Sequence, residues 1–201
     1  MKFFDPFAVT TVTGDRLPHW FQSGATLFVT FRLADSLPRE KLKSLREERQ
    51  RWCEEHPEPW DEATERKYHL RFSAKIDRWL DEGAGSCLFA DPSKSKIVMD
   101  ALLHFDGQRY IVHSAVVMPN HVHVLFTLQR DQSLDRLIHS WESFTAHKLG
   151  SSSLWQRDYF DRIIRDADHF CNVRAYIRNN PGKAKLREDD YRLHEAPVEW
   201  L

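Results

Sequence analysis

Residues 116–126 read VVMPNHVHVLF, and this stretch decides how the fold is interpreted. Pro119 and Asn120 are turn formers that interrupt an apolar run, which then resumes with His121 and His123. Side chains two residues apart on a strand point to the same face, so the two imidazoles project together and Val122 faces the opposite layer. The stretch therefore predicts a hairpin whose second strand carries a pair of histidines able to share one cation. The alternative is an ordinary strand, since a chain with 11 histidines can contain such a triplet by chance.

The flanking sequence supplies the strands of a sheet around this turn. YIVHSAVVM (110–118) is β-branched and apolar, and HVHVLFTL (121–128) follows the turn as its partner. Far upstream, TLFVTFRL (26–33) alternates with a period of two and predicts a third strand. The sequence therefore predicts an antiparallel sheet with the histidine strand in it.

Helical patterns occupy most of the remaining chain. They cover residues 38–55, 61–83, 91–107, 133–150 and 167–181, with Asp91 and Ser133 as expected caps and Pro181 as the expected end of the last helix. Residues 151–166 have a mixed pattern that predicts partly extended chain, and 186–201 is expected to be a polar tail. The order β, α, α, α, β, β, α, α predicts an α+β fold with an antiparallel sheet covered by helices.

Length and composition suit a single domain. The 201 residues are 41% hydrophobic and 29% charged, and Lys+Arg 29 against Asp+Glu 30 gives a net charge of -1. This balance counts mildly against nucleic-acid binding, and the C-terminal third is locally basic only to the modest extent that is usual for a solvated surface. Three cysteines without metal-site spacing indicate reduced thiols in a cytoplasmic protein. We expect no membrane segment, because no run of about 18 apolar residues occurs, and no signal peptide.

The last predicted helix carries two further polar groups of interest. Tyr176 and Asn180 are four residues apart and therefore lie on one helical face. That face borders the apolar stripe formed by Phe170, Val173 and Ile177. A phenol and an amide at the edge of the helix–sheet interface could reach a metal held by the sheet. The alternative is a tyrosine at the rim of the core and an asparagine that ends a helix.

Taken together, the ordered motifs resemble a known family. PNHVHVLF, a serine-capped helix, LWQRDYFDRIIRD and RAYIRNNPGKAKL are similar to the REP-associated tyrosine transposases, which are single-tyrosine HUH transposases. The resemblance covers residues 20–33 and 108–187, whereas 34–107 corresponds only loosely and is longer and more helical. The resemblance implies a ferredoxin-like domain, here one domain over 1–201 with a helical insertion at about 34–107.

The resemblance also assigns roles to residues. His121 and His123 match the two metal-binding histidines, and Tyr176 matches the nucleophile. Asn180 stands where the wider superfamily commonly has a glutamine as third ligand, and its side chain is one methylene shorter. Tyr159, in RDYFDR, is the rival nucleophile. The implied activity is cleavage and joining of single-stranded DNA near palindromic hairpin repeats, through a 5′-phosphotyrosine and a free 3′-hydroxyl.

Mixed nitrogen and oxygen ligands favour Mg²⁺ or Mn²⁺ as the cofactor. We expect activity to fall below about pH 6, where histidine ligands ordinarily protonate. The partner would be single-stranded or hairpin DNA, bound by a monomer or homodimer that is cytoplasmic and associated with the nucleoid. The candidates for phosphate contacts are Arg157, Arg162, Arg165, Arg174, Arg178, Lys183 and Lys185.

Two other interpretations remain open from the sequence. One is a domesticated protein that binds DNA hairpins without cleaving them, which would keep the fold and the basic C-terminal third but need no tyrosine chemistry. The other is a structural zinc site, which lacks a cysteine at suitable spacing from the histidines.

Overall fold

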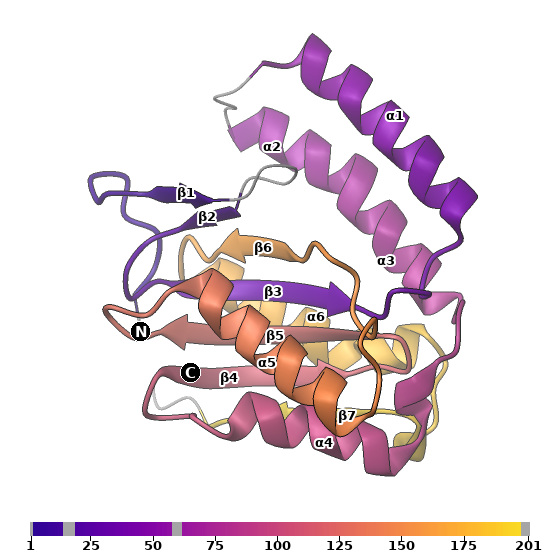
Figure 1. Cartoon of the computed structure of the whole chain (residues 1–201). Helices are drawn as coiled ribbons and strands as arrows, with labels where there is room; N and C mark the ends of the chain where they lie inside the picture. The colour runs from indigo at the N-terminus through magenta and orange to yellow at the C-terminus, as the bar shows by residue number, and fades with distance from the viewer. Residues whose placement is uncertain (1, 14–18, 58–61, 198–201) are drawn as a thin grey trace.

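A five-stranded antiparallel sheet forms the centre of the computed structural model, which describes residues 2–13, 19–57 and 62–197 (Figure 1). The strand order is β6-β3-β5-β4-β7. The strands of this sheet are β3 (Thr26–Arg32), β4 (Tyr110–Val117), β5 (His121–Leu128), β6 (Phe160–Ile163) and β7 (Arg192–Glu195). A separate pair, β1 (Thr11–Thr13) and β2 (His19–Phe21), forms a small two-stranded sheet.

The connections between these strands give the ferredoxin-like fold. Strand β3 leads through helices to the β4–β5 hairpin, and α5 (Leu134–Lys148) then leads to β6. Strands β3 and β5 lie side by side at the centre, with β6 beside β3 and β4 beside β5. This βαββαβ arrangement is the ferredoxin-like pattern. The α+β, ferredoxin-like prediction is therefore confirmed.

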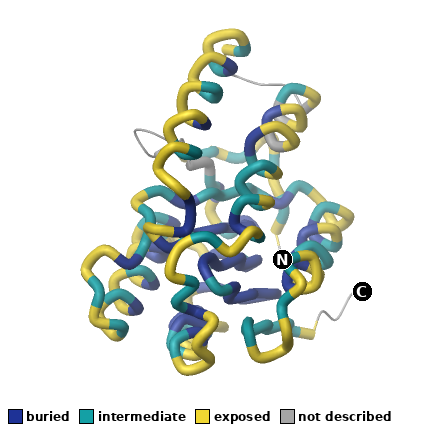
Figure 2. The backbone as a smooth tube through the Cα atoms, turned by 90° about the vertical axis from the view of Figure 1, so that its right-hand side faces the viewer, coloured by how far each residue is buried: buried dark blue, intermediate teal, exposed yellow. Residues whose placement is uncertain are grey.

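Helices cover both faces of the sheet (Figures 1 and 2). On one face α4 (Pro92–Leu103) and α5 pack on a core that includes Val122, Val124 and Phe126 of β5. On the other face α6 (Ala167–Lys183) packs through Phe170, Val173 and Ile177 against a smaller core that includes Leu125. Alternate residues of β5 thus serve opposite layers, which leaves the odd-numbered histidines on the α6 side.

The structure corrects several predicted boundaries. Helix α6 continues through Pro181 to Lys183. The backbone N–H of Ala184 still donates to the carbonyl of Asn180, and that of Leu186 donates to the carbonyl of Pro181. The expected polar tail contains a 3-10 turn, η3 (Glu188–Asp190), and strand β7, which pairs with β4. Residues 198–201 of that tail lie outside the described residues. The caps at Asp91 and Ser133 are confirmed.

The long connection after β3 holds an inserted helical unit. It contains α1 (Arg39–Glu55), α2 (Glu62–Tyr68), the π-helical turn η1 (His69–Ser73) and α3 (Ala74–Asp81). The helix expected over 61–83 therefore includes a π turn, and Asp61 lies outside the described residues. The insertion contains fewer residues than the predicted 34–107, because α4 packs on the sheet and so belongs to the ferredoxin-like domain. The 3-10 turn η2 (Leu88–Ala90) precedes α4.

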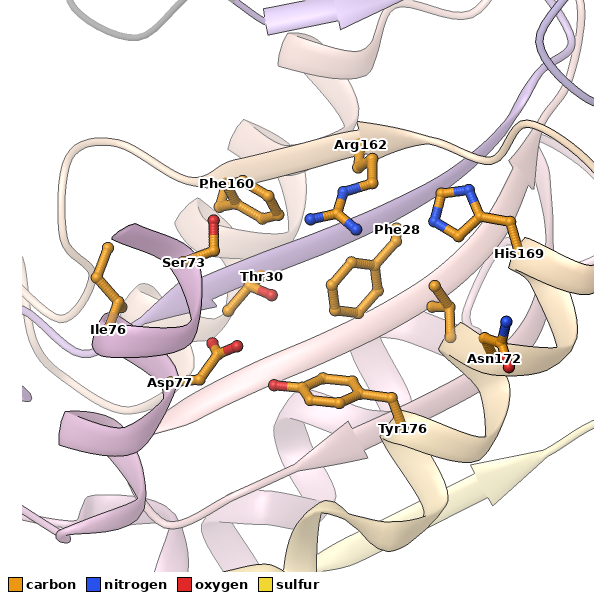
Figure 3. A pocket seen from close by; sticks show the side chains of 11 residues that line it. Phe28, Thr30, Ser73, Ile76, Asp77, Phe160, Arg162, His169, Asn172 and Tyr176 are labelled. Carbon is orange, nitrogen blue, oxygen red and sulfur yellow. The ribbon is translucent and has the colours of Figure 1, made fainter. Parts of the chain in front are cut away.

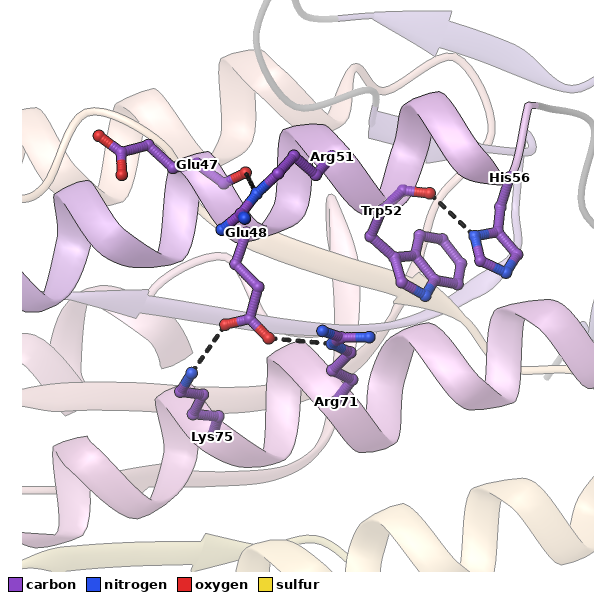
Figure 4. A network of polar contacts seen from close by, with 7 residues as sticks. All are labelled: Glu47, Glu48, Arg51, Trp52, His56, Arg71 and Lys75. Carbon is purple, nitrogen blue, oxygen red and sulfur yellow. Dashed lines mark hydrogen bonds and ion pairs between the residues drawn. The ribbon is translucent and has the colours of Figure 1, made fainter.

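The inserted helices have a small core and an ion-pair network of their own (Figure 4). Trp52 of α1 packs against Tyr68 and Phe72, with ring centroids 5.3 and 5.9 Å away. Glu48 of α1 accepts hydrogen bonds from Arg71 at 2.9 Å and from Lys75 at 2.8 Å. These contacts fix α1 against the helix that leads into α3. No helix in the described part of the chain is long and apolar enough to cross a membrane.

The two ends of the inserted unit meet where Gly85 packs against the backbone of Asp35. Gly85 has φ +88°, and a Cβ there would lie 2.5 Å from the carbonyl oxygen of Asp35. Gly107 also has positive φ, at +75°, but a Cβ there would meet nothing within 4 Å. The loop closure therefore requires glycine at 85 for two reasons, conformation and close approach.

We expect Gly85→Ala to destabilise the protein more than Gly107→Ala. Backbone strain alone costs roughly 1–2 kcal/mol at either site, and the clash with Asp35 adds to it only at Gly85. Urea unfolding of the two variants measures the difference in the free energy of unfolding. Equal losses would show that the Asp35 contact relaxes at no cost.

Candidate active site

The two histidines of β5 form the centre of a buried polar cluster. His121 is 1% exposed and His123 is 0% exposed. Their Nε2 atoms lie 3.1 Å apart. Two atoms that bind one octahedral ion at right angles, each about 2.1 Å from it, lie roughly 3 Å apart. The spacing of the two nitrogens therefore fits adjacent ligands of a single cation.

Hydrogen bonds on the far side of each ring orient the pair. Asn120 donates its amide N–H groups to the backbone carbonyls of Leu80 and Ala84, each at 3.1 Å. Its amide oxygen must therefore accept from Nδ1 of His121, which lies 2.7 Å away. The proton on Nδ1 leaves the lone pair of His121 on Nε2, facing His123.

His123 is fixed in a similar way from the neighbouring strand. Thr30 of β3 lies directly opposite His123 in the sheet, and its hydroxyl is 2.7 Å from Nδ1. Phe28 stacks on the imidazole with ring centroids 5.5 Å apart. The register between β3 and β5 thus holds His123 with its Nε2 directed at His121.

Asn180 brings an amide to the same point from α6. Its Nδ2 atom lies 3.4 Å from Nε2 of His123, and its Oδ1 atom is buried with no hydrogen-bond partner. A buried amide oxygen without a donor is unusual in a folded protein. A cation beside the two Nε2 atoms would satisfy it, so the donor set of two imidazoles and one amide fits a divalent metal. Within the described ranges, no group of three His, Cys, Asp or Glu residues is placed to hold an ion.

Tyr176 lies one helical turn before Asn180 and faces the same cluster. Its ring meets that of His123 edge to face, with centroids 5.3 Å apart, and Lys183 lies 4.7 Å above the ring. Helix α6 packs over the β5 strand of the same chain, which brings Tyr176 beside the histidines of this chain. The structure therefore brings together all four residues predicted to form the site.

Tyr176 lines a cavity of about 260 Å³ between β3, β6, α3 and α6 (Figure 3). Burial raises the pKa of the Tyr176 hydroxyl, and the carboxylate of Asp77 raises it further. The resting phenol is therefore protonated at neutral pH, and it needs activation before it can act as a nucleophile.

Tyr159, the rival nucleophile, has a structural position. It belongs to the core beneath α4 and α5, on the other face of the sheet from the histidines. Its hydroxyl donates to the carboxylate of Asp135 at 2.6 Å. Burial, followed by this contact, raises the pKa of Tyr159. Its place on the opposite face separates it from the histidine pair.

The predicted phosphate-binding cations fall into three groups. Arg162 lines the cavity and Lys183 lies over Tyr176, so both are close to the candidate nucleophile. Arg174 and Arg178 instead contact Glu195 of β7, at 3.4 and 2.8 Å. The remaining candidates do not line the cavity: Arg157 and Lys185 are exposed, and Arg165 is half-buried.

Three residues of the site were not predicted. Asn120 is part of the turn that precedes the histidines, so its position could have suggested a role. Thr30 depends on the register between two strands, which the sequence does not specify. Asp77 comes from the inserted helices, where nothing in the pattern distinguishes it from other surface acids.

Burial changes the expected pH behaviour of the histidines. It lowers the pKa of His121 to about 3, with a further contribution from Arg32, and it holds the pKa of His123 well below 6.5. In the folded protein, burial therefore opposes the histidine protonation at about pH 6 on which the expected fall in activity was based. Below pH 6.5 the unfolded chain takes up protons that the folded chain excludes, so these residues reduce the stability as the pH falls.

We therefore expect both imidazoles to remain neutral at pH 5 in the metal-free protein. Nitrogen-detected NMR of ¹⁵N-histidine-labelled protein reports this state directly. The two resonance sets should show no protonation between pH 7 and 5. A titration midpoint near pH 6.5 for either residue would show that water reaches the pair.

The comparisons with known proteins agree with the sequence motifs. Residues 105–180 match the family model described as "Transposase IS200 like". This segment contains both histidines, Tyr176 and Asn180, and it confirms the resemblance to tyrosine transposases. A solved structure described as "Structure of the REP associates tyrosine transposase bound to a REP hairpin" is 15% identical, with a TM-score of 0.49, over 85% of this chain and 74% of that chain. No match was found among curated proteins.

Proposed function

We propose that this protein is a metal-dependent endonuclease and strand-transferase for single-stranded DNA, acting near palindromic hairpins through a phosphotyrosine at Tyr176. The observation that carries the proposal is the convergence of His121, His123, Asn180 and Tyr176 beneath one helix. The family match over residues 105–180 supports a transposase-like activity. The ferredoxin-like sheet provides a rigid base for the ligands.

The buried pair can hold a divalent ion because the Nε2 atoms of the two rings face one another and the Asn180 oxygen lacks a donor. Mg²⁺ or Mn²⁺ bound there would polarise the scissile phosphate and stabilise the charge that develops on it. The ring contacts with His123 and Phe28 hold the Tyr176 phenol beside that position. With such an ion bound, the site would combine a cation that activates the phosphate with a positioned nucleophile.

The reaction follows from these positions. The Tyr176 oxygen attacks phosphorus, the bond from phosphorus to the 3′ oxygen breaks, and the phenol loses its proton. The products are a 5′-phosphotyrosine and a 3′ end that takes up a proton from solvent. The 3′-hydroxyl of the same or another strand can then attack the phosphotyrosine, which rejoins DNA and restores the phenol without ATP.

The surrounding cations suit a DNA backbone. Arg162 and Lys183 flank the nucleophile and would contact phosphates on either side of the cleaved bond. Phosphates near Arg174 and Arg178 must compete with Glu195 for these side chains. The strength of DNA binding should therefore depend strongly on salt concentration.

Incubation with Mn²⁺ and labelled hairpin oligonucleotides from the DNA that flanks the gene tests the proposal. A covalent protein–DNA adduct that resists denaturation should form, together with a free 3′-hydroxyl fragment, and omission of metal should prevent both. Tight hairpin binding without an adduct would instead indicate a DNA-binding protein that does not cleave.

A further inference from the structure

The inserted helix α3 contributes a carboxylate to the candidate active site. Asp77 lines the same cavity as Tyr176, and Figure 3 shows the tyrosine hydroxyl directed at this carboxylate. The hydroxyl itself is buried and has no hydrogen bond of standard geometry in the described part of the chain. Catalytic hydrogen bonds are often long in proteins without substrate and shorten when substrate binds.

Helix α3 is held in place by Asn120, the residue that orients one histidine of the candidate metal site. The side chain of Asn120, which orients His121, also bonds the carbonyls of Leu80 at the end of α3 and Ala84 just beyond it. The start of α3 is tied to α1, since Lys75 pairs with Glu48 (Figure 4). Helix α3 is therefore fixed at both ends relative to the histidine pair.

The π-helical turn η1 immediately precedes α3 and ends at Ser73, which also lines the cavity. Turns of this type shift the register of the following helix and are frequent at functional sites. Here Ile76 and Asp77 follow the turn, and both face the cavity.

We propose that Asp77 accepts the proton of the Tyr176 hydroxyl as the phenol oxygen attacks phosphorus, an inference that rests on the function proposed above. The geometry of the cavity supports this proposal, because Asp77, an acidic residue of the insertion, lines the cavity beside Tyr176. The insertion then supplies a catalytic group to the ferredoxin-like domain.

The step balances without another reagent. The Tyr176 oxygen forms a bond to phosphorus while its proton passes to the carboxylate, and the bond from phosphorus to the 3′ oxygen breaks. The 3′ oxygen takes a proton from solvent, and the Asp77 carboxyl releases one to solvent. In the joining direction the carboxyl first takes a proton from solvent and gives it to the departing phenol oxygen, while the attacking 3′-hydroxyl loses its proton to solvent. Transfer is concerted with attack, because a phenol oxygen bonded to phosphorus is far more acidic than the free phenol.

The groups around Asp77 set the pH at which it can act. The pKa of Asp77 is raised to about 6, chiefly by burial, and Asp81 on the next turn of α3 also raises it. The contact with Tyr176 and the charges of Arg162 and Lys183 act in the opposite direction and lower it. The carboxyl is therefore mostly ionised at pH 7.5 and able to accept a proton. As the pH falls through about 6, the carboxyl becomes protonated and this role is lost.

The test compares Asp77→Asn with Asp81→Asn in the full-length protein, using the Mn²⁺ and hairpin oligonucleotides described above. The amide introduced by Asp77→Asn keeps the shape of the side chain but cannot take a proton. The single-turnover rate of adduct formation should fall by about 10²-fold or more, and hairpin affinity should stay within a few-fold. The wild-type rate should rise with pH up to about 6 and then level off, and Asp77→Asn should lose this rise.

The controls separate the possible outcomes. Asp81→Asn removes a nearby charge of the same sign, so an equal loss in both variants would assign the effect to charge and overturn the proton role. Mn²⁺ binding to the protein without DNA should be unchanged in Asp77→Asn, and a large loss of affinity would make Asp77 a metal ligand instead. If the wild type forms the adduct and Asp77→Asn forms it at the same rate, the role of Asp77 is overturned while the proposed function stands. No adduct with wild type overturns the proposed function, and this inference with it.

Discussion

Replacing Tyr176 with phenylalanine is expected to reduce formation of the covalent DNA adduct by at least about 10⁴-fold, since loss of a nucleophile removes the entire pathway. The ring contacts with His123 and Phe28 do not involve the hydroxyl. The variant should therefore fold, bind Mn²⁺ and bind hairpin DNA as the wild type does. Denaturing gel electrophoresis of the reaction with labelled oligonucleotide measures the loss.

Tyr159→Phe is the matched control, because it also removes one buried hydroxyl. This change loses the bond to Asp135 and should lower the free energy of unfolding by about 1–3 kcal/mol. It should leave the adduct yield close to that of the wild type. An adduct that persists in Tyr176→Phe and disappears in Tyr159→Phe would reverse the assignment of the two tyrosines.

Replacing His121 and His123 together with alanine should abolish metal-dependent cleavage. The two Nε2 atoms are the donors that the structure orients toward one another, and the amide of Asn180 alone binds a hard cation weakly. At a Mn²⁺ concentration of about 100 times Kd, binding should stabilise the wild type by roughly 2.7 kcal/mol. Thermal unfolding with and without Mn²⁺ should show this gain in the wild type and its loss in the double variant.

His113→Ala provides the comparison for loss of a buried imidazole. His113 lies in β4, bonds the hydroxyl of Thr127 at 2.7 Å and packs on Phe170, away from the candidate metal position. Its removal should lower stability while the response to Mn²⁺ and the cleavage reaction persist. A double variant at His121 and His123 that still responds to Mn²⁺ would place the metal elsewhere.

The sequence predicted the parts of this protein that depend on local periodicity. Alternation along β5 placed His121 and His123 on one face, and a spacing of four residues placed Tyr176 and Asn180 on one helical face. The structure brings these two faces together. The ferredoxin-like arrangement was predicted through the resemblance, because the order of strands in a sheet is not visible in the pattern of one chain.

The features that were missed depend on contacts distant in the sequence. Pro181 was expected to end α6, but helical bonds on either side of it carry the helix on to Lys183. Strand β7 owes its place to pairing with β4, and Glu195 at its end binds two arginines of α6. Asp77 lines the cavity beside Tyr176 on α3, a helix that follows a π turn and whose far end is bonded to Asn120. None of these contacts has a local signature.

Mass spectrometry of the DNA-linked peptide tests the central claim most directly. Trypsin cleaves after Arg174 and Arg178, so residues 175–178 form a short peptide that contains Tyr176. After nuclease digestion of an adduct formed with Mn²⁺ and hairpin oligonucleotide, this peptide should carry a 5′-nucleotide on its tyrosine. A nucleotide on the peptide that contains Tyr159, or on a residue other than tyrosine, would contradict the account.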